Sequence, residues 1–203
     1  MTLNGRRVSI CIPAKDEEAT IEEVITRSKP HGDELFVVDG HSSDRTRELA
    51  EAMGVAVYLD EGLGKGCAVR EAVARATGDI LVTIDADLSF DPEDIPRLVE
   101  PVAAGDAEYG NGSRMRGGSD ELHGDLDKFI RMVGQDIITL GINYRFGVRL
   151  TDSQSGFRAI DLAAARSITL QENITTTEQE MVIKFLRKGY RIVEVPTHEY
   201  ASR

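Results

Sequence analysis

Two aspartates close an apolar run in the stretch LVTIDADLSF, residues 81–90, where one alanine separates Asp85 from Asp87. Side chains two residues apart on a strand point the same way, so both carboxylates are expected to face one cleft. Neighbouring negative charges repel unless a cation lies near them. Carboxylate oxygens suit Mg²⁺ or Mn²⁺, which bind substrate phosphates through one or two such ligands. The triplet therefore predicts a metal–diphosphate site, although an aspartate ending a strand and another capping a turn would give the same letters.

The first half of the chain alternates strand and helix patterns. Strands are expected at residues 7–14, 33–40, 55–60 and 79–86. Helices are expected at residues 20–28 with a Thr20/Glu23 capping box, 42–54 between a Ser43 or Asp44 cap and Gly54, 64–78 ending at Gly78, and from Asp91 onward. This alternation predicts a parallel sheet with right-handed crossovers, and ligands gather at the carboxyl ends of such strands, where Asp85 and Asp87 stand.

After about residue 106 the pattern changes. A strand is expected at residues 107–114, a helix at 126–147, a polar loop at 151–161, a helix at 177–189 and a strand at 190–200. No linker rich in Pro, Gly or Ser divides the chain. We therefore expect one domain over residues 1–203, with a first lobe of about residues 1–115 and a second of about 116–203.

Composition points to a water-soluble globular protein, with 41% hydrophobic and 29% charged residues. A net charge of −11 without a Lys/Arg cluster argues against nucleic acid as a partner. The two cysteines, Cys11 and Cys67, lie far apart in apolar or small-residue surroundings, which favours buried thiols over a zinc site. Neither a membrane-spanning run nor a signal-peptide pattern is present, so a cytoplasmic location is expected.

Seven stretches, taken in order, resemble the family 2 inverting glycosyltransferases, and most closely their dolichol-phosphate mannosyltransferase and polyprenyl-phosphate sugar transferase group. They are IPAKDEEATI, VVDGHSSDRT, GLGKGCAVREAVARATGDI, IDADLSFDPEDI, GSRMRGG, TDSQSGFRAI and GYRIVEVP. The resemblance spans nearly the whole chain. It implies the GT-A fold, an α/β architecture with a mostly parallel central sheet flanked by helices, together with a nucleotide-sugar donor and Mg²⁺ or Mn²⁺.

The resemblance also assigns residues of the first lobe. Donor binding falls to Pro13, Ala14, Lys15, Glu17, Asp39, Lys65 and Asp85, with Asp16 where relatives often have asparagine. Asp39 would contact the base, while Lys65 in GLGKG would meet phosphate or stabilise the donor loop. The metal ligands implied are Asp85, Asp87 and Ser89, the last standing where relatives often have glutamine. His198 is a conceivable ligand, but a lone histidine is usually structural. Asp44 is expected to cap a helix.

The second lobe is expected to hold the acceptor. Arg114, in the GSR motif, is a candidate catalytic cation with Asp87, and Asp152 is a candidate general base or acceptor-orienting acid. Guanidinium groups match phosphate oxygens well. The residues expected at the acceptor phosphate are Arg131, Ser155, Arg158, Glu180 and Arg203. Turns, ion pairs and solvated surface charges are the structural alternatives for these residues.

The expected reaction is inverting transfer of a hexose from a GDP-mannose or UDP-glucose type donor to a polyprenyl (dolichyl) phosphate. A soluble acceptor such as a phosphorylated small acid remains open, as does a non-catalytic nucleotide-binding module. A sugar nucleotidyltransferase should carry a glycine-rich basic loop, whereas residues 12–18 read IPAKDEE. Peripheral contact with the cytoplasmic membrane face through residues 129–147, packing of that helix within the protein, and a homodimer are further expectations.

Overall fold

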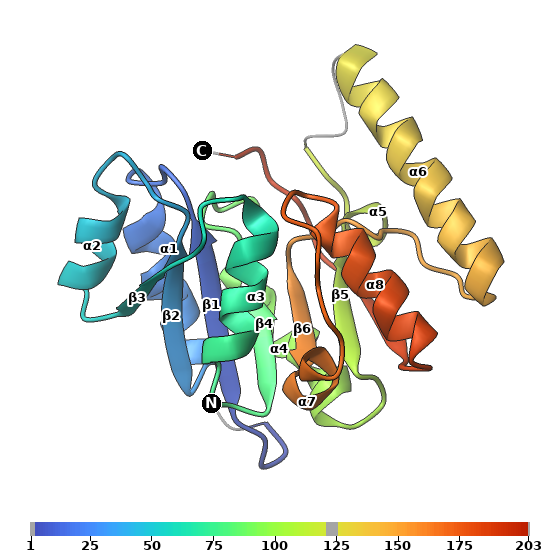
Figure 1. The fold of residues 1–203 in the computed structure, drawn as a ribbon, viewed down its shortest axis with the longest axis horizontal. Helices are drawn as coiled ribbons and strands as arrows, with labels where there is room; N and C mark the ends of the chain where they lie inside the picture. Colours follow the sequence, from blue (N-terminus) through green and yellow to red (C-terminus); the bar gives the residue numbers. More distant parts are fainter. Residues whose placement is uncertain (1–2, 121–125, 203) are drawn as a thin grey trace.

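One seven-stranded sheet, in the order β3-β2-β1-β4-β6-β5-β7, runs through both predicted lobes (Figure 1). The computed structural model describes residues 3–120 and 126–202, without the side chains of residues 126–133 and 135. Strand β6 runs antiparallel to β4 and β5, and all other neighbouring strands pair in parallel. The mostly parallel sheet flanked by helices is therefore confirmed.

The first four strands are β1 (Val8–Ala14), β2 (Glu34–Asp39), β3 (Ala56–Leu59) and β4 (Ile80–Thr83). Their β-branched residues suit a strand covered on both faces, and every residue of β4 is buried. Ala14 lies beside Asp39 in the parallel register, so β1 and β2 finish together. The loops that follow these strands consequently meet at one edge of the sheet.

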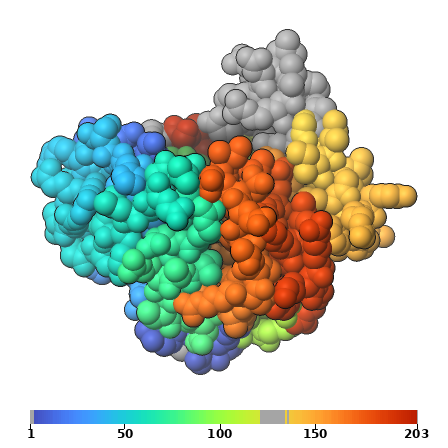
Figure 2. All heavy atoms as spheres, in the orientation of Figure 1, coloured from blue at the N-terminus to red at the C-terminus, as the bar shows by residue number. Residues whose placement is uncertain are grey.

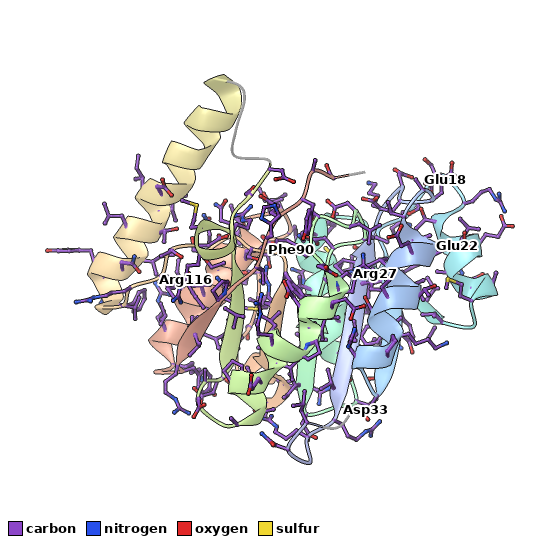
Figure 3. The ribbon with its side chains drawn as sticks, turned by 180° about the vertical axis from the view of Figure 1, so that it is seen from behind. Glu18, Glu22, Arg27, Asp33, Phe90 and Arg116 are labelled. Carbon is purple, nitrogen blue, oxygen red and sulfur yellow. The ribbon has the colours of Figure 1, made fainter. Side chains whose placement is uncertain are left out.

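Helices cover both faces of the sheet. Helix α3 (Lys65–Arg75) packs on β1, β2 and β4, with α7 (Leu162–Arg166) and α8 (Thr177–Arg187) on the same side (Figure 1). Helices α1 (Ile21–Ser28) and α4 (Ile95–Ala103) cover the opposite face, as Figure 3 shows from behind. The remaining elements of the first lobe are α2 (Thr46–Ala52), η1 (Lys29–His31) and η2 (Pro92–Asp94).

The elements not yet named are β5 (Tyr109–Ser113), β6 (Arg158–Asp161), β7 (Ile192–Pro196), α5 (Arg114–Gly117) and α6 (Leu126–Phe146). Helix α6 lies at the margin of the molecule (Figures 1 and 2). Ile142 packs inward, while Ile137, Leu140 and Tyr144 are 64%, 68% and 92% exposed. Within the described residues, no helix is both long enough and apolar enough to cross a bilayer.

Several local predictions need correction. Thr20 occupies the N-cap of α1, but its side chain makes no capping bond and contacts Glu17 instead. Helix α3 ends at Arg75 rather than at Gly78. The predicted polar loop contains β6, because pairing with β4 and β5 orders residues that carry no strand pattern of their own.

Other local predictions are confirmed. Asp91 caps η2 by accepting a hydrogen bond from the Glu93 amide at 3.0 Å. Gly54 follows α2 with a φ of 70°, a conformation that glycine adopts without steric cost. Both cysteines are free and buried. By contrast, the expected N-cap at Ser43 or Asp44 was wrong, because Arg45 is the N-cap of α2. Asp44 instead accepts a hydrogen bond from the amide of Thr46, the first residue of the helix, at 2.9 Å.

Candidate active site

Two adjoining pockets form a cleft at the carboxyl edge of the sheet. The first pocket has a volume of about 340 Å³ and lies over the ends of β1 and β2. The second pocket, about 380 Å³, is lined by residues from both halves of the chain. Both pockets include Lys65, Asp85 and Asp87, so the predicted aspartate pair lies where they meet.

Most of the predicted donor residues line the first pocket, together with the predicted metal ligand Asp87: Pro13, Ala14, Lys15, Glu17, Lys65 and Asp85. Asp39 is an exception, because it is only 1% exposed and accepts a hydrogen bond from the Ser42 amide at 3.2 Å. The acid that lines the pocket near the end of β3 is Asp60, which accepts from the Gly62 amide at 2.6 Å. Its place as the last residue of the third predicted strand was the available signal.

The loop after β1 is fixed by the loop after β2. Asp16, with a φ of 57°, accepts hydrogen bonds from the Ser43 amide at 2.6 Å and the Ser43 hydroxyl at 3.0 Å. The Glu17 amide donates to the Thr46 hydroxyl at 2.7 Å. Asp16 therefore needs only acceptor oxygens here, which explains how aspartate can stand at this position.

Asp85 and Asp87 lie on a loop rather than on the strand, because β4 ends at Thr83. The strand-alternation argument was therefore wrong in detail, although both side chains do line the same cleft. Leu88, with a φ of 57°, turns the chain, and the Ser89 amide donates to Asp87 Oδ1 at 2.9 Å. The described residues contain no group of three or more His, Cys, Asp or Glu arranged to hold a metal.

This donor set fits a magnesium-type ion whose coordination is completed by phosphate and water. Asp87 Oδ1 accepts a hydrogen bond from the Ser89 backbone amide, and the negative charge of the carboxylate can bind a cation. Glu17 lies near enough that burial, together with the charges of Asp87 and Asp85, raises its pKa. Carboxylates gathered in this way favour a cation between them.

Lys65 is the cation that the protein itself supplies. Its Nζ lies 2.8 Å from Asp85 Oδ1, 2.9 Å from Asp85 Oδ2 and 3.3 Å from Glu178 Oε1. Burial opposes its charge, but the two carboxylates outweigh burial and the pKa of Lys65 is raised. Glu178 in turn lies 3.5 Å from Arg158 Nη2. Positive and negative side chains therefore alternate from the buried Arg158, through Glu178 and Lys65, to Asp85 in the cleft.

Close backbone approach holds this arrangement together. A Cβ added to Gly156 would lie 2.1 Å from Asp85 Oδ2 and 2.8 Å from Lys65 Nζ. A Cβ added to Gly66 would lie 1.9 Å from the Glu172 carbonyl oxygen. The Gly66 backbone amide donates a hydrogen bond to the Asn173 carbonyl oxygen at 3.0 Å. The glycines of GLGKG therefore admit a second-lobe loop, and the Gly66 amide is not free for phosphate.

Arg114 lines the second pocket, and each nitrogen of its guanidinium donates one hydrogen bond to a carboxylate. Nε donates to Asp152 Oδ2 at 2.6 Å, Nη2 to Asp152 Oδ1 at 3.0 Å and Nη1 to Glu199 Oε1 at 3.1 Å. Burial opposes the charge of Arg114, but these carboxylates raise its pKa overall. Asp152 has a 4% exposed side chain and also accepts from the Gln154 amide. It supports Arg114 and is poorly placed to act as a free base.

The predicted acceptor residues fare less well. Arg158 is 1% exposed and donates to the Ser155 carbonyl at 2.6 Å, and Ser155 is itself buried. Glu180 lines neither pocket and pairs with Lys184 at 2.6 Å. None of these three residues lines either pocket. The Arg131 side chain and the whole of Arg203 lie outside the described residues.

Ser89 does line the second pocket. His198 lines neither pocket: its imidazole contacts the Asp120 carboxylate at 3.1 Å and stacks near Tyr200. The second-pocket residues missed by sequence reasoning are Gln154, Thr175, Glu178 and Glu199. Glu178 lies two residues before Glu180, the acid that the sequence predicted at the acceptor phosphate. Helical spacing alone does not say which of the two acids faces a cleft.

The fold and the cleft define a GT-A nucleotide-sugar transferase domain. The family model for glycosyl transferase family 2 matches residues 9–169, and the chain belongs to this family. Glucosyl-3-phosphoglycerate synthase from Mycobacterium tuberculosis, solved with Mn²⁺, UDP-glucose and phosphoglyceric acid, is similar with a TM-score of 0.78 and 30% identity. That similarity covers 98% of this chain and 72% of the synthase chain.

Two curated relatives extend the comparison. The glycosyltransferase AglJ of Haloferax volcanii is 32% identical over 195 residues, which is 95% of this chain and 63% of the relative. The UDP-N-acetylglucosamine–dolichyl-phosphate N-acetylglucosaminyltransferase of Methanococcus voltae is 28% identical over 213 residues. This match covers 93% of this chain and 84% of the relative. The chain spans only 46% to 63% of the length of the two Haloferax volcanii relatives that it matches.

Proposed function

We propose that this chain transfers a hexose, with inversion, from a GDP-mannose or UDP-glucose type donor to a polyprenyl phosphate. The observation that carries the proposal is the shared boundary of the two pockets at Lys65, Asp85 and Asp87. A nucleotide in the first pocket would bring its diphosphate to this boundary. The sugar would then enter the second pocket, where an acceptor can approach from the opposite side.

Asp87, with Asp85, would hold Mg²⁺ or Mn²⁺ beside the diphosphate. The ion, when bound, supplies a Lewis acid that stabilises charge on the departing nucleoside diphosphate. Lys65 adds a fixed positive charge at the same boundary, next to Asp85. A phosphate acceptor is already anionic near neutral pH and so needs no general base. The engagement of both Asp152 oxygens agrees with such an acceptor.

Arg114 is the residue that we assign to acceptor orientation. Its guanidinium is held by Asp152 and Glu199 at the rim of the second pocket. Holding the side chain in place lowers the entropy that an arginine loses when it orders a phosphate. We place the reaction at the cytoplasmic side of a membrane, with the exposed residues of α6 as the membrane contact.

A soluble phosphorylated acid is the second candidate acceptor. The polar lining of the second pocket, including Gln154 and Thr175, favours it, and the similar synthase was solved with phosphoglyceric acid. Both candidates share an acceptor phosphate. They differ in whether an apolar chain must lie along the protein.

A binding panel followed by a transfer assay tests the proposal. UDP, GDP, dTDP and their hexose derivatives are added with and without Mn²⁺, and thermal unfolding is followed. At about 100 times Kd, a ligand stabilises the fold by about 2.7 kcal/mol, a rise in Tm of roughly 5–10 °C for a chain of this size. Radiolabelled sugar should then partition into the organic phase with polyprenyl phosphate, whereas 3-phosphoglycerate would give a water-soluble product.

The two stages separate the alternatives. Donor binding without transfer to either acceptor would favour a non-catalytic nucleotide-binding module. No response to any nucleotide, with or without Mn²⁺, would contradict the donor site itself. The Asp87→Ala variant should lose the Mn²⁺-dependent part of the Tm shift, and an unchanged shift in that variant would contradict the metal assignment.

A further inference from the structure

Glu178 is a buried acid with an unused oxygen at the wall of the second pocket. The side chain is 3% exposed, and Oε1 lies between Lys65 Nζ and Arg158 Nη2 at 3.3 and 3.5 Å. Oε2 has no hydrogen-bond partner among the described residues. A buried polar atom without a partner costs free energy, so an unpaired carboxylate oxygen beside a pocket points to a ligand group.

The other acids of the second pocket, apart from Asp87, have a partner at each carboxylate oxygen. Both Asp85 oxygens contact Lys65, and the Arg114 guanidinium is shared by Asp152 and Glu199. The Glu199 oxygens accept from Arg114 and from the Ser119 hydroxyl. Beyond Asp87, at the boundary, Glu178 is therefore the acid of this pocket that can accept a further hydrogen bond.

The group that meets Glu178 must be a neutral donor. Lys65 and Arg158 already balance its charge, and an anion would be repelled by the carboxylate. Lys65 also joins Glu178 to Asp85, at the boundary where the donor's diphosphate would lie. The part of the donor just beyond the diphosphate is the sugar, whose hydroxyls are neutral donors.

We propose that Glu178 is a specificity-determining residue that accepts a hydrogen bond from a hydroxyl of the transferred sugar. This inference rests on the proposed function, because it assumes a nucleotide-sugar donor. Placing the acid at the start of α8, with Oε1 clamped by two cations, fixes Oε2 in a preset position. A site that hydrogen-bonds a hydroxyl discriminates strongly against analogues lacking it, because the buried acceptor is then left unpaired.

The test compares the affinity of the sugar nucleotide with that of the nucleoside diphosphate alone. Calorimetric titrations with Mn²⁺ use UDP-glucose against UDP and GDP-mannose against GDP. Losing a hydrogen bond to a charged group should weaken binding of the sugar nucleotide on the order of 10- to 100-fold in Glu178→Gln, with the nucleoside diphosphate affected far less. Deoxy-sugar analogues of the preferred donor should bind wild type more weakly and the variant nearly unchanged.

Glu180→Gln is the matched control. Like Glu178, Glu180 is an acid on α8 that pairs with a lysine, but it lines neither pocket. In the variant, the glutamine side-chain oxygen can still accept hydrogen bonds from the backbone amides of Gln171 and Glu172. Its sugar-nucleotide affinity should equal that of wild type. A purely structural role for Glu178 would instead lower the unfolding temperature and weaken the nucleoside diphosphate and the sugar nucleotide equally.

Each outcome decides between the two proposals. If wild type prefers the sugar nucleotide and Glu178→Gln keeps that preference, the inference is overturned while the donor site stands. If wild type binds the diphosphate and the sugar nucleotide equally, the inference also fails. If wild type binds neither, the proposed function itself fails. If Glu178→Gln does not fold, wild type with the deoxy donors decides, and no loss at any hydroxyl overturns the inference.

Discussion

At the scale of single residues, the cleft is built from charges that hold one another in place. Arg114 is fixed by Asp152, and the Asp152 backbone amide is fixed by Glu194 Oε1 at 2.8 Å. Lys65 is fixed by Asp85 and Glu178. Removing one member of such a buried pair leaves the other uncompensated, which is costlier than the net worth of the pair.

Asp152→Asn tests the supporting role assigned to that residue. The asparagine side chain keeps the shape of the aspartate but loses the negative charge that binds Arg114. We therefore expect the free energy of unfolding to fall by about 2 kcal/mol. Urea denaturation measures this change. The exposed Asp106→Asn should stay within about 0.5 kcal/mol of wild type. A variant that is fully stable yet loses the acidic limb of its pH–rate profile would instead identify Asp152 as the general base.

Glu17 should make stability depend on pH in the metal-free protein. Burial and the charges of Asp87 and Asp85 raise its folded pKa above the ordinary value of 4.5, so the folded state favours the protonated form. The Glu17 contribution to stability is then present below pH 4.5 and lost as the pH rises through the raised pKa. Glu17→Gln should be more stable than wild type at neutral pH in EDTA, and the gap should close on acidification. An equal gap at all pH values would contradict this.

At the scale of elements, glycine lets loops from the two lobes meet. The start of α3 approaches the loops before β6 and α8 so closely that Gly156 and Gly66 leave no room for a Cβ. The obstacles differ in kind. Gly156 faces the ends of two side chains, whereas Gly66 faces backbone.

Alanine at these two glycines should therefore have different effects. Gly156→Ala can be accommodated if Asp85 and Lys65 move, so we expect unfolding to change little and Mn²⁺-dependent nucleotide binding to weaken at least tenfold. Gly66→Ala must push the 172–173 backbone away, which should cost about 1–3 kcal/mol of stability. Thermal unfolding and nucleotide titration on both variants measure this. Equal losses of stability would mean that the Asp85–Lys65 pair is as rigid as backbone.

At the scale of the whole molecule, the cleft is lined by both halves of the chain, and the exposed face of α6 belongs to the second half. Ile137, Leu140 and Tyr144 follow a helical spacing and are largely exposed, so they form an apolar stripe on the surface of α6. Such a stripe is typical of a membrane contact or of an interface between copies. The proposed lipid acceptor favours the membrane.

Vesicle flotation tests the membrane contact. Wild type should float with phosphatidylcholine vesicles that contain polyprenyl phosphate, and a variant with serine at positions 137, 140 and 144 should not. Because these side chains are exposed, the variant should keep its fold and its nucleotide affinity. Sedimentation distinguishes the rival: a wild-type dimer that the variant converts to monomer, without vesicle binding by either, would assign the face to a second copy.

The sequence predicted the strands of the first lobe and most of the donor pocket because both depend on local patterns. Apolar runs gave β1, β2 and β4, and motif position gave Glu17, Lys65 and the aspartate pair. It was less successful with Asp39 and Arg158, which proved buried. A charged residue at the end or start of a strand reads the same whether it faces solvent, a ligand or a buried partner.

The sequence by itself determined the alternation of strands and helices, the edge at which their loops meet and the acidic pair placed there, since each follows from hydrophobic period and connection geometry. Only the tertiary structure decided that β6 runs antiparallel between β4 and β5, and that α8 turns Glu178 rather than Glu180 toward the cleft. Those outcomes depend on packing between segments at least 75 residues apart in the sequence, and no local pattern encodes such contacts.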